Sequence, residues 1–173
     1  MAAGDRQASR WHLSPALLGI YLNDHLAGAT AGVQLAQRAA ASNRNTRIGE
    51  PLEHLAAEMA EEKAAMIEMM RALGVPVRHY KVYAAWLGEK AGRVKLNGHL
   101  VRRSPLSALE EIEALQIGVA GKTAAWRTLR ALAEHDSRLD RWRLDHLIAA
   151  ADRQSHVLEE IRLRAVAEVL ASS

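Results

Sequence analysis

The side chains that could do chemistry in this chain are carboxylates and imidazoles, because the sequence contains no cysteine. The lack of cysteine excludes a thiolate nucleophile, a zinc finger and a cysteine-ligated iron–sulfur cluster. Glu58, Glu61 and Glu62 recur at helical spacing, and Asp152 and His156 lie four residues apart on one helical face. Carboxylates and imidazoles are ligands for metal ions, although acidic residues at this spacing more often form a solvated face.

Three other polar residues fall on stripes that are otherwise apolar. His25 lies on such a stripe, where a histidine is either a hydrogen-bonded core residue or a ligand. Gln116 and Gln154 hold comparable positions in two later segments. We expect these two glutamines to pair across the core as neutral amides, because buried polar groups need hydrogen-bond partners.

The segment from Val77 to Pro105 is strongly basic. It carries seven basic residues and one acidic residue, a net charge of +6, whereas the whole chain has a net charge of +3. Aromatic residues are interleaved with the basic ones, which suits binding to phosphates or to an anionic membrane surface. The alternative is that the aromatics pin the segment to acidic helices. Anion binding would use Lys81, Lys90, Arg93, Lys95, Arg102 and Arg103.

The elements that must position these residues are helices. Alanine and leucine make up about a third of the chain and aromatic residues 4%, which argues against a β-sandwich or a barrel. Ser14-Pro15 and Ser104-Pro105 are helix starts with serine as N-cap, and Gly74 is a helix stop. Together with the apolar stripes, these signals predict helices over residues 15–41, 51–73, 105–134 and 139–170. The stripe of the second helix comprises Leu52, Leu55, Met59, Glu62, Met66, Met69 and Leu73. That of the third comprises Leu109, Ile112, Gln116, Val119, Thr123, Trp126 and Leu129.

The connections between these helices predict how they are arranged. The turns near residues 42–50 and 135–138 are short, so each joins antiparallel neighbours. The connection over residues 76–104 is long enough to cross the bundle, which makes the second and third helices parallel. We expect residues 1–13 to form a flexible tail and residues 14–173 to form a single domain.

Glycines and methionines mark further positions inside the predicted helices. Gly28 and Gly32 lie in the first helix and Gly118 and Gly121 in the third. Glycine weakens a helix interior, so we expect close helix–helix packing at these positions to compensate for the lost stability. The methionines of the second helix predict an adaptable core, with a ligand pocket as the alternative.

The second predicted helix resembles that of bacterioferritin-type proteins, which carries Glu-x-x-His, an apolar stretch and then Gly-x-Pro. Here the segment runs from Glu58 through Leu73-Gly74-Val75-Pro76, and LNDHLAGATAGVQLAQR resembles the first helix of ferritin-like proteins. The resemblance implies an all-α, ferritin-like antiparallel four-helix bundle with a long crossover between helices 2 and 3.

The same resemblance implies a di-metal centre, built from a glutamate on each of two helices and Glu-x-x-His on each of the other two. This chain departs from that pattern. Glu61 stands where the histidine should follow Glu58, Asp152 and His156 replace the second pair, and Glu-x-x-His occurs nowhere. The residues that could still serve as ligands are Glu58, Glu61, Glu62, Glu113, Asp152, His156 and His25.

The favoured function is therefore a binding or structural module without a classical di-iron centre and without catalytic residues. One alternative is a di-metal carboxylate protein that holds iron or manganese and has oxidase or metal-handling activity. Another is a binder of anionic surfaces through the basic crossover. We expect a cytoplasmic protein, since no apolar run is long enough to span a membrane. The resemblance also implies a homodimer, because ferritin-like bundles often pair.

Overall fold

The computed structural model describes residues 14–78 and 105–171, and they form four long helices. These are α1 (Pro15–Ser42), α2 (Gly49–Ala72), α4 (Pro105–Leu132) and α5 (Arg141–Ala171). The prediction of an all-α domain of four helices is confirmed. The expected N-terminal tail and most of the expected crossover lie outside the described residues.

The predicted serine cap of α1 and the predicted glycine stop of α2 are both present. The Ser14 hydroxyl accepts a hydrogen bond from the Leu17 N–H at 3.3 Å, ahead of Pro15 in the first turn. After α2, Gly74 adopts a φ of +71°, a left-handed conformation that glycine reaches without steric cost. The sequence therefore placed both ends correctly.

The start of α2 differs from the prediction, because the helix begins at Gly49 rather than at Pro51. The chain folds back tightly after α1, where the Asn43 side chain donates to the Ala39 carbonyl at 2.7 Å. A Cβ on Gly49 would lie 2.4 Å from the carbonyl oxygen of Asn43. Glycine therefore lets the new helix start two residues earlier than the proline indicates.

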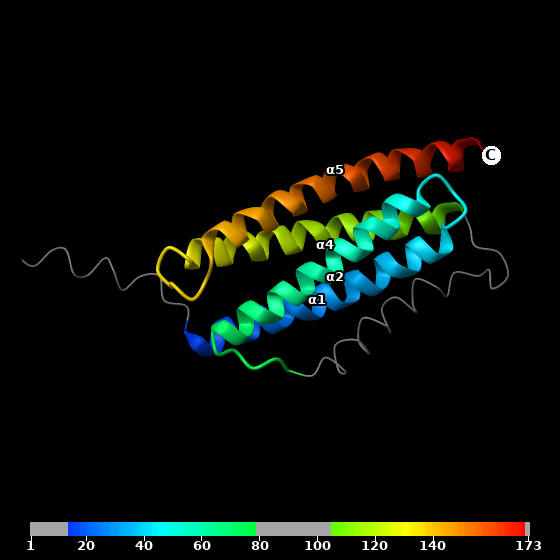
Figure 1. Cartoon of the computed structure of the whole chain (residues 1–173). Coiled ribbons are helices and arrows are strands. Elements are labelled where there is room, and N and C mark those ends of the chain that lie inside the picture. Colours follow the sequence, from blue (N-terminus) through cyan, green and yellow to red (C-terminus); the bar gives the residue numbers. More distant parts are fainter. Residues whose placement is uncertain (1–13, 79–104, 172–173) are drawn as a thin grey trace, which may run out of the picture.

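The helices pack as two hairpins, α1 with α2 and α4 with α5, joined mainly through α1 against α4. The contact between α2 and α5 is the loosest of the four, and α2 faces α4 across the diagonal. Figure 1 shows α2 and α4 running in the same direction, as the long connection predicts, with both hairpins antiparallel. No helix within the described ranges is long and apolar enough to cross a membrane.

The core lies along the facing stripes of the four helices. On α2 every residue of the predicted stripe is buried, from Leu52 through Met59 and Met66 to Leu73. On α4 and α5 the core includes Trp126, Leu129, Leu158 and others, each at most 1% exposed. Buried polar side chains interrupt this core at its middle, and they define the candidate site.

Candidate functional site

Three polar side chains from three different helices meet inside the bundle. They are Glu62 of α2, Lys122 of α4 and Gln154 of α5, with exposed fractions of 5%, 9% and 2%. The more exposed Glu58, one turn before Glu62 on α2, adjoins them. These four residues are called the central cluster below.

Hydrogen bonds connect every member of the central cluster. The Lys122 Nζ forms an ion pair with the Glu62 carboxylate and also donates to Oε1 of Gln154. The Gln154 Nε2 donates to Oε1 of Glu62 at 3.0 Å and to Oε2 of Glu58 at 2.8 Å. Gln154 therefore uses both ends of its amide, and the ammonium and the carboxylate neutralise each other in the core.

Burial controls the electrostatics of the ion pair. It raises the pKa of Glu62 and lowers the pKa of Lys122, and in both cases the attraction between the two groups opposes the shift. The loss of hydration is the larger effect on each side chain, so the pair is costly to bury and costly to break. The pair links α2 to α4 through the core.

The register of the helices explains why these residues meet. Along α2 and α5, Glu68 pairs with Arg143 and Glu58 with Gln154. The two helices therefore run antiparallel with the same register at both contacts. Along α4 and α5, Gln116 meets Glu159 near one end of the interface and Arg130 meets Asp145 near the other. Lys122 lies midway between these contacts on α4.

The expected pairing of Gln116 with Gln154 is wrong. Gln116 donates to Oε2 of Glu159 at 2.9 Å, near the surface of the α4–α5 hairpin. Gln154 is hydrogen-bonded to Lys122 and Glu62 of the central cluster instead. The two glutamines lie on stripes that face each other, but the register of the hairpin separates them by more than a turn.

The other residues predicted as metal ligands are scattered. Glu61, Glu113 and His156 are exposed, and Asp152 is an exposed partner of Arg127 at 3.6 Å. His25 is half-buried beside Tyr21, where burial lowers its pKa and nearby Asp24 raises it less. Glu62 and Glu58 are thus the two predicted ligands that meet at mid-bundle. The residues predicted to bind anions lie outside the described ranges.

The residues present do not fit the di-metal centre that the sequence resemblance implies. Such a centre needs several carboxylates and imidazoles around concentrated positive charge. Here the ammonium of Lys122 already occupies the oxygen ligands of Glu62 and Gln154. Across residues 14–78 and 105–171, no three His, Asp or Glu side chains are grouped so that they could hold a metal ion.

Lys122 is the functional residue that sequence reasoning missed. A lysine in a long helix is usually solvated, and the predicted stripe passed through Thr123 instead. The sequence does contain a signal, because Leu115, Val119, Trp126 and Leu129 stand at helical spacing on either side of Lys122. All four of these neighbours are at most 1% exposed, so a lysine between them should be buried.

A cavity of about 180 Å³ adjoins the central cluster on the side of α1. Its inner wall contains Glu62, Lys122 and Trp126, with Met59 and Met66 from α2. The indole Nε1–H of Trp126 is buried and has no hydrogen-bond acceptor among the described residues. Further lining residues are Asp24, His25, Gly28, Ala29, Gly32, Lys63, Gly118 and Gly121.

Three of the four glycines in this wall do not make the close contacts predicted from the sequence, whereas Gly32 does. A Cβ added to Gly28, Gly118 or Gly121 would meet nothing within 4 Å. At Gly32 the added atom would lie 3.0 Å from the terminal methyl of Met59, which is a flexible side chain. Three of the four glycines therefore leave open space rather than fill a tight interface.

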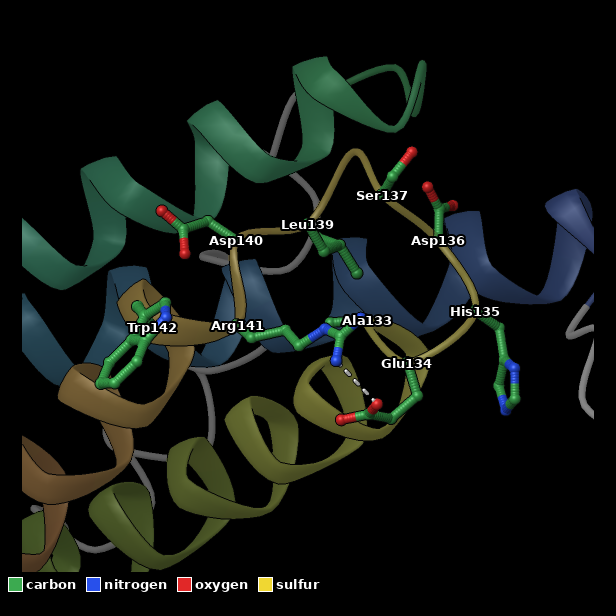
Figure 2. A pocket seen from close by; sticks show the side chains of 9 residues that line it. All are labelled: Ala133, Glu134, His135, Asp136, Ser137, Leu139, Asp140, Arg141 and Trp142. Carbon is green, nitrogen blue, oxygen red and sulfur yellow. Dashed lines mark hydrogen bonds and ion pairs between the residues drawn. The ribbon is translucent and has the colours of Figure 1, made fainter.

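A second, wider hollow lies at the turn between α4 and α5 (Figure 2). Its acidic side chains are engaged, since Glu134 accepts from Arg141 at 3.0 Å and Asp136 pairs with Arg138. The Trp142 side chain at its edge is 78% exposed. This arrangement stabilises the turn between α4 and α5.

The fold and the central cluster thus define an all-α four-helix domain with a lysine–glutamate ion pair in its core. Searches against family models, curated proteins and solved structures found nothing that matches this chain.

Proposed function

We propose that this chain is a ferritin-like four-helix bundle that works as a binding module and in which an ion pair replaces the di-metal centre. The arrangement of the helices supports the ferritin-like part of the proposal. Two antiparallel hairpins are joined by a long connection, and α2 and α4 run parallel across the diagonal. Ferritin-like bundles have this connectivity.

The observation that carries the proposal is the ammonium of Lys122. It lies on the diagonal between α2 and α4 in the bundle core, where ferritin-like proteins build their metal sites. A single positive charge there pairs with Glu62 and is shared with Gln154. The cation that balances the buried carboxylate is therefore supplied by the chain itself.

Titration with Fe(II) and Mn(II) tests this proposal. Because a lysine ammonium and a divalent ion repel each other, we expect no saturable binding of two metal ions per chain. We also expect an unchanged Tm in excess metal, since a ligand that prefers the native state would raise it.

The matched control is Glu62→Gln, which removes a carboxylate from the core and leaves the surface carboxylates in place. Weak metal binding that is equal in the two proteins would come from the surface and would agree with the proposal. Two metal ions per chain, bound by the unmodified protein and lost in Glu62→Gln, would overturn it.

A further inference from the structure

One side of α1 lacks the charges that a helix at the edge of a bundle normally carries. Residues 25–37 contain no Asp, Glu, Lys or Arg, although among the described helices α1 packs against α2 and α4 alone. Helical spacing continues the side that holds Asn23 through Ala27, Thr30, Ala31 and Gln34. A helix without a charged face is typically covered on more than one side, so we expect a further segment to lie against this one.

The chain brings the start of residues 79–104 to this side of α1. The Asn23 side chain donates to the Pro76 carbonyl at 3.1 Å and accepts from the Arg78 N–H at 2.8 Å. These two hydrogen bonds hold the backbone on both sides of Val77 against α1. The residues that follow Arg78 therefore begin beside Asn23.

The other end of the same segment lies at the far end of the bundle. The Tyr21 hydroxyl donates to Thr128 Oγ1 at 3.0 Å, so the start of α1 lies beside the end of α4, and the two helices run antiparallel (Figure 1). Pro105, the first residue of α4, is about 35 Å from Thr128 along the helix axis. Residues 79–104 must cover this distance alongside α1. An extended chain of this length reaches about 85 Å, which leaves room for a folded segment on the helix.

The segment and the α1–α2 hairpin have opposite charges. Residues 79–104 carry six Lys or Arg and one Glu, a net charge of +5. Six glutamates against Lys63 and Arg71 give α2 a net charge of −4, whereas α1, α4 and α5 each have a net charge of zero. Since α1 packs against α2, a segment along α1 brings its positive charge beside the most acidic of the four described helices.

The segment also has apolar residues that suit the uncharged side of α1. Tyr80, Tyr83 and Leu87 stand at the spacing of one helical face, and Lys81 and Glu89 fall on another. This spacing predicts an amphipathic helix, which needs an apolar surface to cover its aromatic side.

We propose that the Asn23 side of α1 is the docking surface for residues 79–104 of the same chain, with Tyr80 and Tyr83 against Ala27 and Ala31. The basic side chains of the segment then lie near the carboxylates of α2, which makes the segment part of the bundle rather than an arm that binds anions. This inference goes beyond the proposed function and does not depend on whether metal binds.

Limited digestion with trypsin tests the docking, because the segment contains cleavage sites at Lys81 and Lys90. Cleavage there should be about tenfold slower in the full chain than in a synthetic peptide of residues 79–104, since only the undocked population is cut. Ala31→Arg places a charge opposite a basic segment and should raise the rate to within about twofold of that of the peptide. Ala149→Arg, at an exposed position of α5, is the matched control and should leave the rate unchanged.

Nuclear Overhauser contacts identify the docked surface in the unmodified chain. Ring protons of Tyr80 or Tyr83 should show contacts to the methyl groups of Ala27 or Ala31. This measurement decides the question even if Ala31→Arg does not fold.

Three results would overturn the inference. The first is cleavage of the segment in the unmodified chain as fast as in the peptide, and the second is the absence of those methyl contacts. The third is a dimer in light scattering that Ala31→Arg converts to a monomer while cleavage of the segment is unchanged, because a second copy would then cover this side of α1.

Discussion

The Nζ of Lys122 on α4 and the carboxylate of Glu62 on α2 form an ion pair across the diagonal of the bundle, with side chains 8% and 6% exposed. The two helices are not neighbours in the packing, so the contact passes through the core. It joins the two hairpins beside Gln154 of α5, which also donates to Glu62. The pair therefore links the two hairpins through their shared core.

Removing one member of this pair should be far more damaging than removing both charges. Lys122→Met leaves the Glu62 carboxylate buried without its cation, which should lower the free energy of unfolding by about 3–5 kcal/mol. Adding Glu62→Gln to Lys122→Met removes the unpaired buried carboxylate. The new amide oxygen can still accept the hydrogen bond from Gln154. The double variant should recover most of the loss, as measured by urea unfolding of all four proteins of the cycle. Additive losses would contradict the coupling.

The glycines should respond to alanine in opposite directions. Gly118→Ala and Gly121→Ala should each raise the free energy of unfolding by about 0.5–1 kcal/mol, because the helix gains stability and the methyl meets no atom. Gly49→Ala should lower it, since its Cβ would lie 2.4 Å from the Asn43 carbonyl oxygen. Urea unfolding of the three variants checks the contrast. Destabilisation by the first two would show that they pack against other atoms.

His25 should make the bundle less stable in mild acid. Burial lowers its pKa below 6.5 in the native state, so below that pH the unfolded chain binds more protons than the folded one. Stability should therefore rise as the pH increases through 6.5. In His25→Gln the rise between about pH 5 and about pH 8 should be smaller. A steeper or identical pH dependence in the variant would contradict this assignment.

Glu159 should contribute to stability in the opposite part of the pH scale. Hydrogen bonds from Arg162 and then from Gln116 lower its pKa from 4.5 to about 2. Its contribution is complete above 4.5 and is lost as the pH falls toward 2. Glu159→Gln should reduce the acid sensitivity of the Tm in this window and leave it unaltered between neutral pH and about pH 6. Equal acid sensitivity in both proteins would show that the carboxylate has no such role.

The helices could be predicted from the sequence because their signals are local. Ser14 caps α1, Gly74 ends the turn after α2, and the buried stripe of α2 was predicted residue by residue. The early start at Gly49 was missed because it depends on the Asn43 carbonyl, a contact between two helices. Hydrophobic spacing holds no information about such a contact.

The central cluster could be predicted in part. Glu62 was placed on the apolar stripe of the second helix and among the candidate ligands, but its partner was not identified. Which residues meet inside a bundle depends on the register of the helices, and this register places Gln116 and Gln154 more than a turn apart. The apolar neighbours of Lys122 were visible in the sequence, yet its burial is favourable only because Glu62 faces it across the diagonal.

The ammonium protons of Lys122 test the central claim most directly. In protein labelled with ¹⁵N-lysine, exposed ammonium groups exchange their protons with water rapidly, whereas a buried, hydrogen-bonded group exchanges slowly. We predict one slowly exchanging ammonium resonance at neutral pH, which is absent in Lys122→Met and shifted in Glu62→Gln. Rapid exchange of every lysine ammonium in the folded, unmodified protein would contradict an ion pair at the centre of the bundle.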